Sequence, residues 1–248
     1  MYTFPMQTLP APMLPTVLHQ DADCLHCHYR PLRSFCNLHL AALTDYSRIG
    51  TTVLHGRGAI PFREDDPGDR VLVICSGQVK LSCASRRGKI LNLRFAQPGD
   101  VLGLGAVMSG GRFEATAEAV EPTYLKTIGR ADFLAFLARH GEASLGAAKA
   151  LADDYRAAFS DARRMALSGS IAGRLAGLLL GWGRAASGDK VEMRFNMALT
   201  HDDLASFTGS SRETVTRTLG KFQRDKLIEI RGASVRVLSP DKLGLLAA

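Results

Sequence analysis

Apolar and polar residues alternate in short runs through the first half of the chain. Between Thr51 and about Ile128, runs such as Arg70–Cys75, Gln78–Cys83 and Ile90–Phe95 are separated by Gly and Pro residues. Short strands bounded by turn residues at this spacing are typical of antiparallel sandwiches, rolls and barrels. The pattern therefore predicts an antiparallel β domain in this part of the chain.

Beyond Ile128 the apolar residues recur at helical spacing. Ala131–Leu137 is predicted as a short helix, and the stretch from Gly141 to Ser168 contains no Pro, which permits one long helix. Apolar residues recur along that stretch in helical steps. Such a stripe either packs on its own domain or forms the seam of a coiled-coil dimer, and the pattern alone leaves both open. Its members are Leu145, Ala148, Leu151, Tyr155, Phe159, Ala162 and Met165.

The flexible sequence Ser168-Gly169-Ser170 follows the long helix and predicts a domain boundary. We also predict a short helix over Leu38–Ile49, a helix over Ile171–Gly183 and a strand over Val191–Phe195. The first residues are rich in Pro and poor in charge, which is typical of a flexible tail. The predicted parts are a tail (1–20), a cysteine-containing segment with the β domain (21–140), the long helix (141–168) and a C-terminal domain (169–248).

The C-terminal domain contains a pattern for two short helices joined by a tight turn. Thr200 and Asp203 are placed to cap the first helix, because a side-chain oxygen there accepts an unpaired backbone N–H. Gly209 supplies the positive φ that a sharp turn needs. Either Ser210 or Ser211 caps the second helix. The predicted buried stripe of the second helix is Val215, Leu219 and Phe222, and Leu204 and Ala205 face inward on the first.

Charged and hydroxyl side chains occupy the outer face near the start of the second helix. In a helix-turn-helix this part enters the major groove, where Arg donates to guanine and Glu accepts from cytosine. Glu213 could instead close a capping box with Ser210, or pair with Arg217. Alternating runs on both sides of Gly232 predict a β-hairpin wing, with basic residues around it for phosphate contacts. The predicted DNA-binding residues are Ser211, Arg212, Glu213, Thr216, Arg217, Lys221 and Arg236.

Charge and composition narrow the possible functions. The chain has 248 residues and a formal net charge of +7, which permits nucleic acid or an anionic membrane as partner. Residues from Ile171 onward hold +4 of this charge, so it is denser around the predicted helix-turn-helix. No apolar run reaches the roughly 18–20 residues that span a bilayer, and the N-terminus lacks the basic start of a signal peptide, so we expect a cytoplasmic protein. The sequence has no P-loop, nucleophile-elbow or HExxH motif, which argues against an enzyme.

Three of the five cysteines, Cys24, Cys27 and Cys36, lie close together in the sequence. In a reducing compartment such a cluster indicates metal or redox chemistry more than a structural disulfide. His26 or His28 could complete a zinc site with these thiols, and Cys24 with Cys27 could form a thiol switch. A CxxC oxidoreductase is the rival class, but its motif should open a helix after a βαβ strand, and no such pattern is present.

The stretch Ser211-Arg-Glu-Thr-Val-Thr-Arg217, followed by Leu219 and Leu227-Ile228, closely resembles the recognition-helix signature of the cyclic-AMP receptor protein and fumarate–nitrate regulator (Crp–Fnr) family of bacterial transcription factors. The resemblance implies an α+β fold with an N-terminal antiparallel β-roll of jelly-roll type, a long dimerisation helix and a C-terminal winged helix-turn-helix. It implies a homodimer whose seam is the long helix, and a palindromic operator with a half-site resembling TGTGA. RNA polymerase is the partner it implies.

The resemblance also raises cyclic AMP as a ligand of the β-roll. Family members bind it with a Gly-Glu pair and a later Arg-Ser pair. Here Leu104 follows Gly103, and Phe113 and Glu114 stand at the Arg-Ser positions. Because Glu114 would repel a phosphate, cyclic AMP is disfavoured.

Cys24, Cys27 and Cys36 resemble the N-terminal ligands of the fumarate–nitrate branch. This resemblance implies an iron–sulfur cluster of the [4Fe-4S] type, which would make DNA binding sensitive to redox state or oxygen. The gap before Cys36 is longer than in that branch, and the family's fourth Cys aligns with Lys126. Zinc, a thiol switch or a small-molecule effector in the β-roll are the alternatives. The candidates for the fourth ligand are Cys75, Cys83, His26 and His28.

Overall fold

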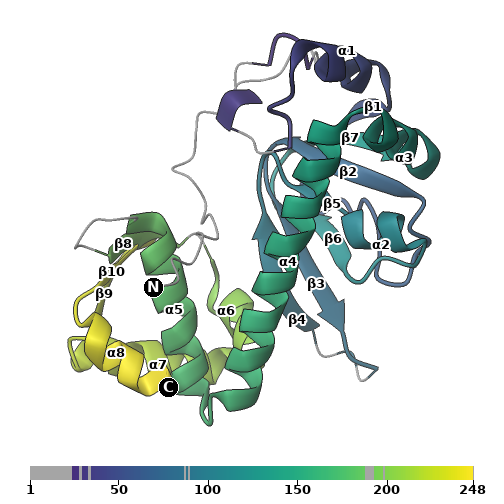
Figure 1. The fold of residues 1–248 in the computed structure, drawn as a ribbon. Helices are drawn as coiled ribbons and strands as arrows, with labels where there is room; N and C mark the ends of the chain where they lie inside the picture. Colours follow the sequence, from purple (N-terminus) through teal and green to yellow (C-terminus); the bar gives the residue numbers. More distant parts are fainter. Residues whose placement is uncertain are drawn as a thin grey trace. The chain divides into compact units, whose positions relative to one another are not determined.

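Figure 1 shows the computed structural model, which describes residues 24–27, 30–32, 35–86, 88, 90–187, 193–197 and 199–247. The predicted tail, residues 1–20, lies outside these ranges. The chain forms two compact units that divide within one long helix, between Asp154 and Tyr155, and each unit is described by itself. In the described ranges, no helix is both long and apolar enough to cross a membrane.

The N-terminal unit contains two antiparallel sheets. One has the strand order β1-β7-β2-β5 and the other β4-β3-β6. The strands are β1 (Thr51–His55), β2 (Arg70–Ser76), β3 (Val79–Ala84), β4 (Ile90–Ala96), β5 (Val101–Leu102), β6 (Thr116–Ala119) and β7 (Thr123–Gly129). The helical elements before the long helix are η1 (Arg30–Leu32), α1 (Leu40–Arg48), α2 (Leu104–Ser109) and α3 (Arg130–Arg139).

Strand β2 separates two apolar clusters, because alternate side chains of a strand point to opposite faces. Val71 and Val73 enter a helix-side cluster, and Leu72 and Ile74 enter an inter-sheet cluster. The helix-side cluster consists of Phe35, Leu38, Ala42, Leu43, Tyr46, Val71, Val73, Val101, Leu104, Val107, Ile128, Phe133, Phe136, Leu137, Ala143 and Ala147. The inter-sheet cluster consists of Phe62, Leu72, Ile74, Val79, Ala96, Leu102, Ala106, Phe113, Ala117 and Leu125.

The long helix α4 (Gly141–Leu167) begins in the N-terminal unit and continues into the C-terminal one. Ala143 and Ala147 belong to the helix-side cluster, and Ala150 and Leu151 pack against it. These residues recur in helical steps, so one face of α4 covers this cluster.

The C-terminal unit is a helical domain with a small antiparallel sheet of order β8-β10-β9. Its core includes the buried side chains of Leu175 and Leu179 from α5, and Phe207 from α6 makes an edge contact with Trp182. The elements are α5 (Ile171–Ser187), β8 (Met193–Asn196), α6 (His201–Thr208), α7 (Arg212–Arg224), β9 (Ile228–Arg231), β10 (Ser234–Val237) and α8 (Pro240–Ala247).

The predicted α+β fold is confirmed, with antiparallel sheets, one long helix and a C-terminal helix-turn-helix. The predicted strands β2, β3 and β4 begin and end within a residue or so of their expected positions. The strand predicted over Val191–Phe195 appears as β8, and residues 191 and 192 lie outside the described ranges. Helices α2 and α8 were not expected.

Candidate nucleic-acid interface and cysteine segment

The turn between α6 and α7 is built by local capping. The Thr200 hydroxyl oxygen accepts from the Asp203 backbone N–H at 3.1 Å, and the Asp203 carboxylate accepts from the Thr200 N–H at 3.0 Å, which completes a capping box. Gly209 ends α6 with a φ of 62°. The hydroxyl of Ser211, rather than that of Ser210, caps α7 by accepting the backbone N–H three residues on, at 3.3 Å. These contacts satisfy backbone N–H groups at the starts of α6 and α7 that have no partner within the helix.

Helix α7 has one buried and one exposed face. Val215, Leu219 and Phe222 are almost completely buried, as predicted, and they pack α7 into the C-terminal unit. Because these positions recur at three- and four-residue spacing, the opposite face of the helix points to solvent. The exposed residues near the start of the helix include Ser211, Arg212, Glu213, Thr216 and Arg217.

Three of the exposed residues on α7 have contacts that orient them. Arg212 forms an ion pair with Asp202 of α6, with 3.6 Å between Nη1 and Oδ2. The Thr216 hydroxyl lies 2.7 Å from His201 Nδ1 and donates to the Arg212 carbonyl oxygen at 2.9 Å. The pKa of Glu213 is lowered by its own backbone N–H and by the Ser211 side chain, so this carboxylate is charged at neutral pH. The helix therefore presents both donors and an acceptor to solvent.

The hairpin of β9 and β10 follows α7 with a turn at Gly232, where φ is 58°, as a wing would. Lys221 at the end of α7 and Arg236 on β10 are exposed. The structure shows no ion pair between Glu213 and Arg217, both of which it describes. The exposed residues of α7 and the wing thus provide positive charge suited to a polyanion.

The apolar stripe predicted on α4 is largely exposed. Leu145 is 56% exposed, Tyr155 70% and Phe159 57%, and the last two rings stack with their centroids 6.3 Å apart. Ala148 and Ala162 are exposed as well. The two remaining members differ, since Met165 is half-buried and Leu151 packs against the helix-side cluster.

Cys24 and Cys36 lie against the helix-side apolar cluster that contains Tyr46. Both cysteines are half-buried. The Tyr46 side chain is 1% exposed, and its hydroxyl has no nitrogen or oxygen hydrogen-bond partner in the part of the chain described. Burial raises the pKa of Tyr46 well above its ordinary value, and the neighbouring Cys36, Cys24 and Cys75 raise it further. Sequence reasoning did not find Tyr46, which lies in the unremarkable helix α1.

The other candidate ligands lie in different surroundings. Cys27 is half-buried, His26 is exposed, and His28 lies outside the described residues. Burial raises the pKa of Cys83, and the nearby carboxylate of Glu64 raises it further. Within the ranges that the structure describes, no three His, Cys, Asp or Glu side chains are already arranged to hold a metal ion. Cysteine thiolates are the ligands that iron–sulfur clusters require, so Cys24, Cys27 and Cys36 have the right chemistry without a formed site.

Lys126, which aligns with the family's fourth cysteine, is also close to Tyr46. It is 3% exposed, with Nζ 5.2 Å from the centre of the Tyr46 ring and 3.4 Å from the Ser47 carbonyl oxygen. A buried ammonium needs compensating partners, and here one is a carbonyl and another an aromatic face. The amine of Lys126 is therefore buried beside the Tyr46 ring.

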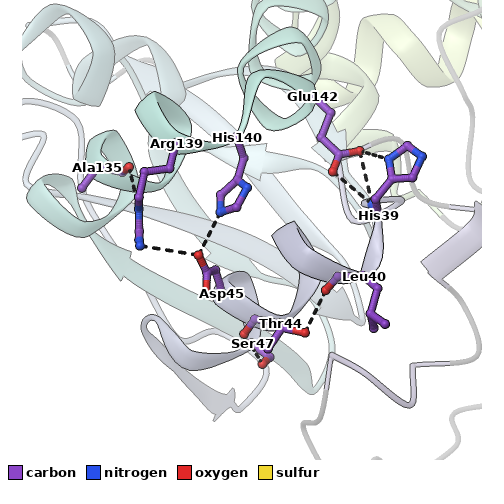
Figure 2. Close-up of polar contacts among 9 residues, drawn as sticks. All are labelled: His39, Leu40, Thr44, Asp45, Ser47, Ala135, Arg139, His140 and Glu142. Carbon is purple, nitrogen blue, oxygen red and sulfur yellow. Dashed lines mark hydrogen bonds and ion pairs between the residues drawn. The ribbon is translucent and has the colours of Figure 1, made fainter.

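A polar network ties the region after Cys36 to the start of α4 (Figure 2). Glu142 accepts from the His39 backbone N–H at 3.1 and 3.2 Å, and His39 Nδ1 lies 2.5 Å from Glu142 Oε2. His140 Nε2 lies 3.0 Å from Asp45 Oδ2 on α1. The pKa values of both carboxyl groups are lowered, chiefly by these side-chain contacts with histidine. The start of α4 and the start of α1 are thus held together by residues far apart in the sequence.

In the β-roll, the positions that correspond to a cyclic-AMP site hold apolar side chains. Leu104 and Phe113 are each 1% exposed, and Phe113 stacks on Phe62 with ring centroids 4.0 Å apart. A Cβ at Gly103 would come within 2.3 Å of the Phe113 ring, so this ring fills the space beside the turn. Glu114, by contrast, is exposed.

Comparison with known proteins gives matches over both units. Residues 173–246 match the family model described as "Crp-like helix-turn-helix domain", and residues 54–140 match the one described as "Cyclic nucleotide-binding domain". The chain is 30% identical to the transcriptional activatory protein AadR of Rhodopseudomonas palustris, over 94% of this chain and 97% of that protein. It is 27% identical to the nitrogen fixation regulation protein FixK of Bradyrhizobium diazoefficiens, over 91% of this chain and 94% of that protein.

The fold also matches solved structures. The structure of FixK2 from Bradyrhizobium japonicum superposes with a TM-score of 0.67 at 21% identity, and the match covers 81% of this chain and 98% of that one. At this identity the match supports the fold and not a ligand.

Proposed function

The chain belongs to the Crp–Fnr family of DNA-binding transcription regulators, and on this basis we propose that it acts as a homodimer on a palindromic operator under the control of an iron–sulfur cluster. The cluster would be held by the N-terminal cysteines and would make DNA binding sensitive to redox state or oxygen. The observation that carries this proposal is that Cys24 and Cys36 both pack against the helix-side cluster that contains Tyr46, and that Cys27 of the same segment is half-buried.

The residues of α7 would read base edges in the major groove. Arg212 and Arg217 can each donate two hydrogen bonds to guanine O6 and N7, and Glu213 can accept from cytosine N4. To contact a base, Arg212 would give up its ion pair with Asp202. Breaking this pair costs little free energy, because exposed ion pairs contribute little to stability. Lys221 and Arg236 would contact phosphates, which supply affinity without sequence preference.

A second copy of the chain would cover the apolar stripe of α4. Leu145, Tyr155 and Phe159 are each more than half exposed. Burying such side chains in a two-fold symmetric helix pair stabilises a dimer by removing apolar surface from water. Two-fold symmetry then requires a palindromic site for the two copies of α7.

An iron–sulfur cluster, when bound, supplies iron–thiolate bonds whose stability depends on its oxidation state. The chain itself supplies a connection from the cysteines to α4. Cys36 lies three residues before His39, and Glu142 holds His39 at the start of α4. Displacing Cys36 would therefore change the anchoring of α4 and shift the population of dimer arrangements that can bind DNA.

Arg94 forms a second connection to α4 within the N-terminal unit. Its guanidinium lies 2.7 Å from Asp100 and 3.1 Å from Asp154 of α4. A small-molecule effector in the β-roll would act through this contact, and it is the alternative form of control. Cyclic AMP is a poor candidate because Phe113 and Glu114 stand where its phosphate would need an Arg and a hydroxyl.

A zinc site or a thiol switch on the same cysteines is a further alternative to the cluster. RNA polymerase is the proposed downstream partner of the DNA-bound regulator. The relatives that the chain matches are transcription regulators, so the CxxC oxidoreductase hypothesis is not supported.

The test is purification without oxygen, followed by an ultraviolet–visible spectrum and iron, sulfide and zinc analysis of the full chain. We expect a brown protein whose absorption disappears in air, and whose affinity for a palindromic duplex changes at the same time. A colourless protein containing stoichiometric zinc would contradict the cluster. Binding of one chain per half-site, measured by sedimentation, tests the dimer separately.

A further inference from the structure

We propose that His201 of α6 is a positioning residue for base recognition, because it donates a hydrogen bond to the Thr216 hydroxyl and so makes Thr216 an acceptor in the major groove. The base edge that Thr216 recognises would then carry an amino group, N4 of cytosine or N6 of adenine. This inference rests on the proposed function and specifies which kind of base edge one residue of α7 reads.

The hydroxyl of Thr216 has two short contacts within the protein. Its oxygen lies 2.9 Å from the Arg212 carbonyl oxygen, one turn earlier on α7, and 2.7 Å from His201 Nδ1. A hydroxyl has one hydrogen and two lone pairs, and a carbonyl oxygen can only accept. Both contacts are hydrogen bonds only if the hydroxyl donates to the carbonyl and Nδ1 of His201 donates to the hydroxyl. One lone pair of the Thr216 oxygen then remains for DNA.

The two ends of this contact are attached to well-anchored helices. His201 is the first residue of α6, whose start is fixed by a capping box. Leu204 in the same turn of α6 is completely buried, and so is Val215, the residue before Thr216 on α7. Side chains on such rigid elements keep their hydrogen-bonding partners in place. To donate to a base, the Thr216 hydroxyl would have to give up hydrogen bonds that it already makes, which costs free energy.

An acceptor at this position discriminates between base edges. In the major groove the amino groups of cytosine and adenine donate, whereas O6 and N7 of guanine and O4 of thymine accept. Two acceptors that face each other are left unpaired, which is unfavourable where water is excluded. The neighbouring Arg217 can only donate. Adjacent positions of α7 would therefore read base edges of opposite kind.

The experiment measures the base preference of the full-length chain, handled without oxygen, on palindromic duplexes. One half-site position at a time carries each of the four base pairs. We expect Thr216→Val, which keeps the shape of the side chain, to lose the preference for an amino group at one position. His201→Ala should weaken the preference at that same position by about three- to tenfold, because a hydroxyl that turns freely can donate as well as accept. His201→Asn should keep the preference, because its amide nitrogen can donate to the hydroxyl.

Thr218→Val is the matched control for the loss of a threonine hydroxyl from α7. The Thr218 hydroxyl donates to the Thr214 carbonyl oxygen at 2.7 Å, the same bond that Thr216 makes one turn back. Thr218 lies about 200° around the helix from Thr216, so it faces away from the proposed base contact. We expect the base preferences of Thr218→Val to match those of the parent at every position.

A contact that only holds α6 against α7 predicts a different result. His201→Ala would then bind every duplex more weakly by the same factor, with its base preference unchanged. That outcome would overturn the proposal, and so would an unchanged preference in Thr216→Val. If the parent chain prefers no palindromic duplex over random DNA, the proposed function itself fails, and this inference fails with it.

A measurement on the unsubstituted chain covers the case in which a variant does not fold. Nitrogen chemical shifts of the histidine rings, measured by nuclear magnetic resonance, report which ring nitrogen carries a hydrogen. The signal that is missing from His201→Ala or His201→Asn, whichever folds by circular dichroism, assigns His201. We expect its Nδ1 to carry a hydrogen, and an unprotonated Nδ1 would show that His201 is not the donor.

Discussion

Helix α7 and the segment that contains Cys24, Cys27 and Cys36 are stabilised in different ways. α7 is capped by Ser211 and has three almost fully buried side chains on one face. In the part of the cysteine segment that the structure describes, there is one short 3₁₀ element, and contacts with the unit include Phe35 and Leu38 in the helix-side cluster, the half-buried Cys24 and Cys36, and the His39 contact with Glu142. We infer that the DNA-reading surface is formed before any signal arrives, whereas the cysteine segment depends on what binds its sulfurs.

The largest expected effect comes from removing the buried face of α7. Phe222→Ala should destabilise the C-terminal unit by about 3–5 kcal/mol, because it leaves a cavity under the helix. DNA binding should be lost with or without oxygen, as measured by chemical unfolding and by a duplex titration. Phe35→Ala is the matched change beside Cys36, since Phe35 is 2% exposed and packs on Tyr46. It should weaken the N-terminal unit and leave the unfolding of the C-terminal unit unchanged.

The next largest effect distinguishes residues of α7 that contact bases from residues that contact phosphates. Arg217→Ala should weaken binding to the specific duplex by about 1–3 kcal/mol and leave binding to random DNA nearly unchanged. Lys221→Ala should weaken both equally and reduce the dependence on salt. Duplex titrations at several salt concentrations measure the affinity of each variant for specific and random DNA and its salt dependence. Equal loss on specific and random DNA for Arg217→Ala would mean that this residue does not read a base.

The two regions also differ in how far the sequence alone predicts them. The capping box, the turn glycine and the buried stripe of α7 involve residues a few positions apart, so local propensities and periodicity determine them. Tyr46 and the strand residues Val71 and Val73 share one cluster with Cys24 and Cys36 only because the tertiary fold brings distant segments together. His39 and Glu142 are 103 positions apart, and neither belongs to a motif. Such contacts depend on the tertiary fold, which pattern analysis of one sequence does not supply.

A smaller effect tests the cap of α7. The sequence offers both Ser210 and Ser211 as the N-cap of α7. In the structure the Ser211 hydroxyl accepts a hydrogen bond from a backbone N–H of the first turn, and it is therefore the cap. Ser211→Ala should therefore lower stability by about 0.5–2 kcal/mol. Ser210→Ala should cost little, because the Ser210 hydroxyl is buried with no hydrogen-bond partner among the described residues. Thermal unfolding of the two variants gives the comparison, and a larger cost at Ser210 would reverse the assignment.

The smallest effect concerns the acid sensitivity of the contact between the cysteine segment and α4. The pKa of Glu142 is lowered from its ordinary 4.5, first by the His39 side chain. A carboxyl whose pKa is lowered in the folded state contributes stability that is complete above its ordinary value and is lost as the pH falls through the lowered one. The contribution of the Glu142 carboxylate should therefore be lost only at acid pH.

Glu142→Gln tests this contact, because the amide keeps the shape of the side chain and removes its charge. Between about pH 6 and about pH 3, the thermal midpoint of the N-terminal unit should fall less steeply in the variant than in the parent. The pKa of Asp45 is also lowered, chiefly by His140, and Asp45 is present in both proteins. The thermal midpoint of the variant should therefore still fall with decreasing pH, but less steeply than that of the parent. The C-terminal unit provides the internal control, since Glu213 has its own lowered pKa and should titrate identically in both chains. Identical slopes in the N-terminal unit would mean that the charge of Glu142 does not hold the cysteine segment to α4.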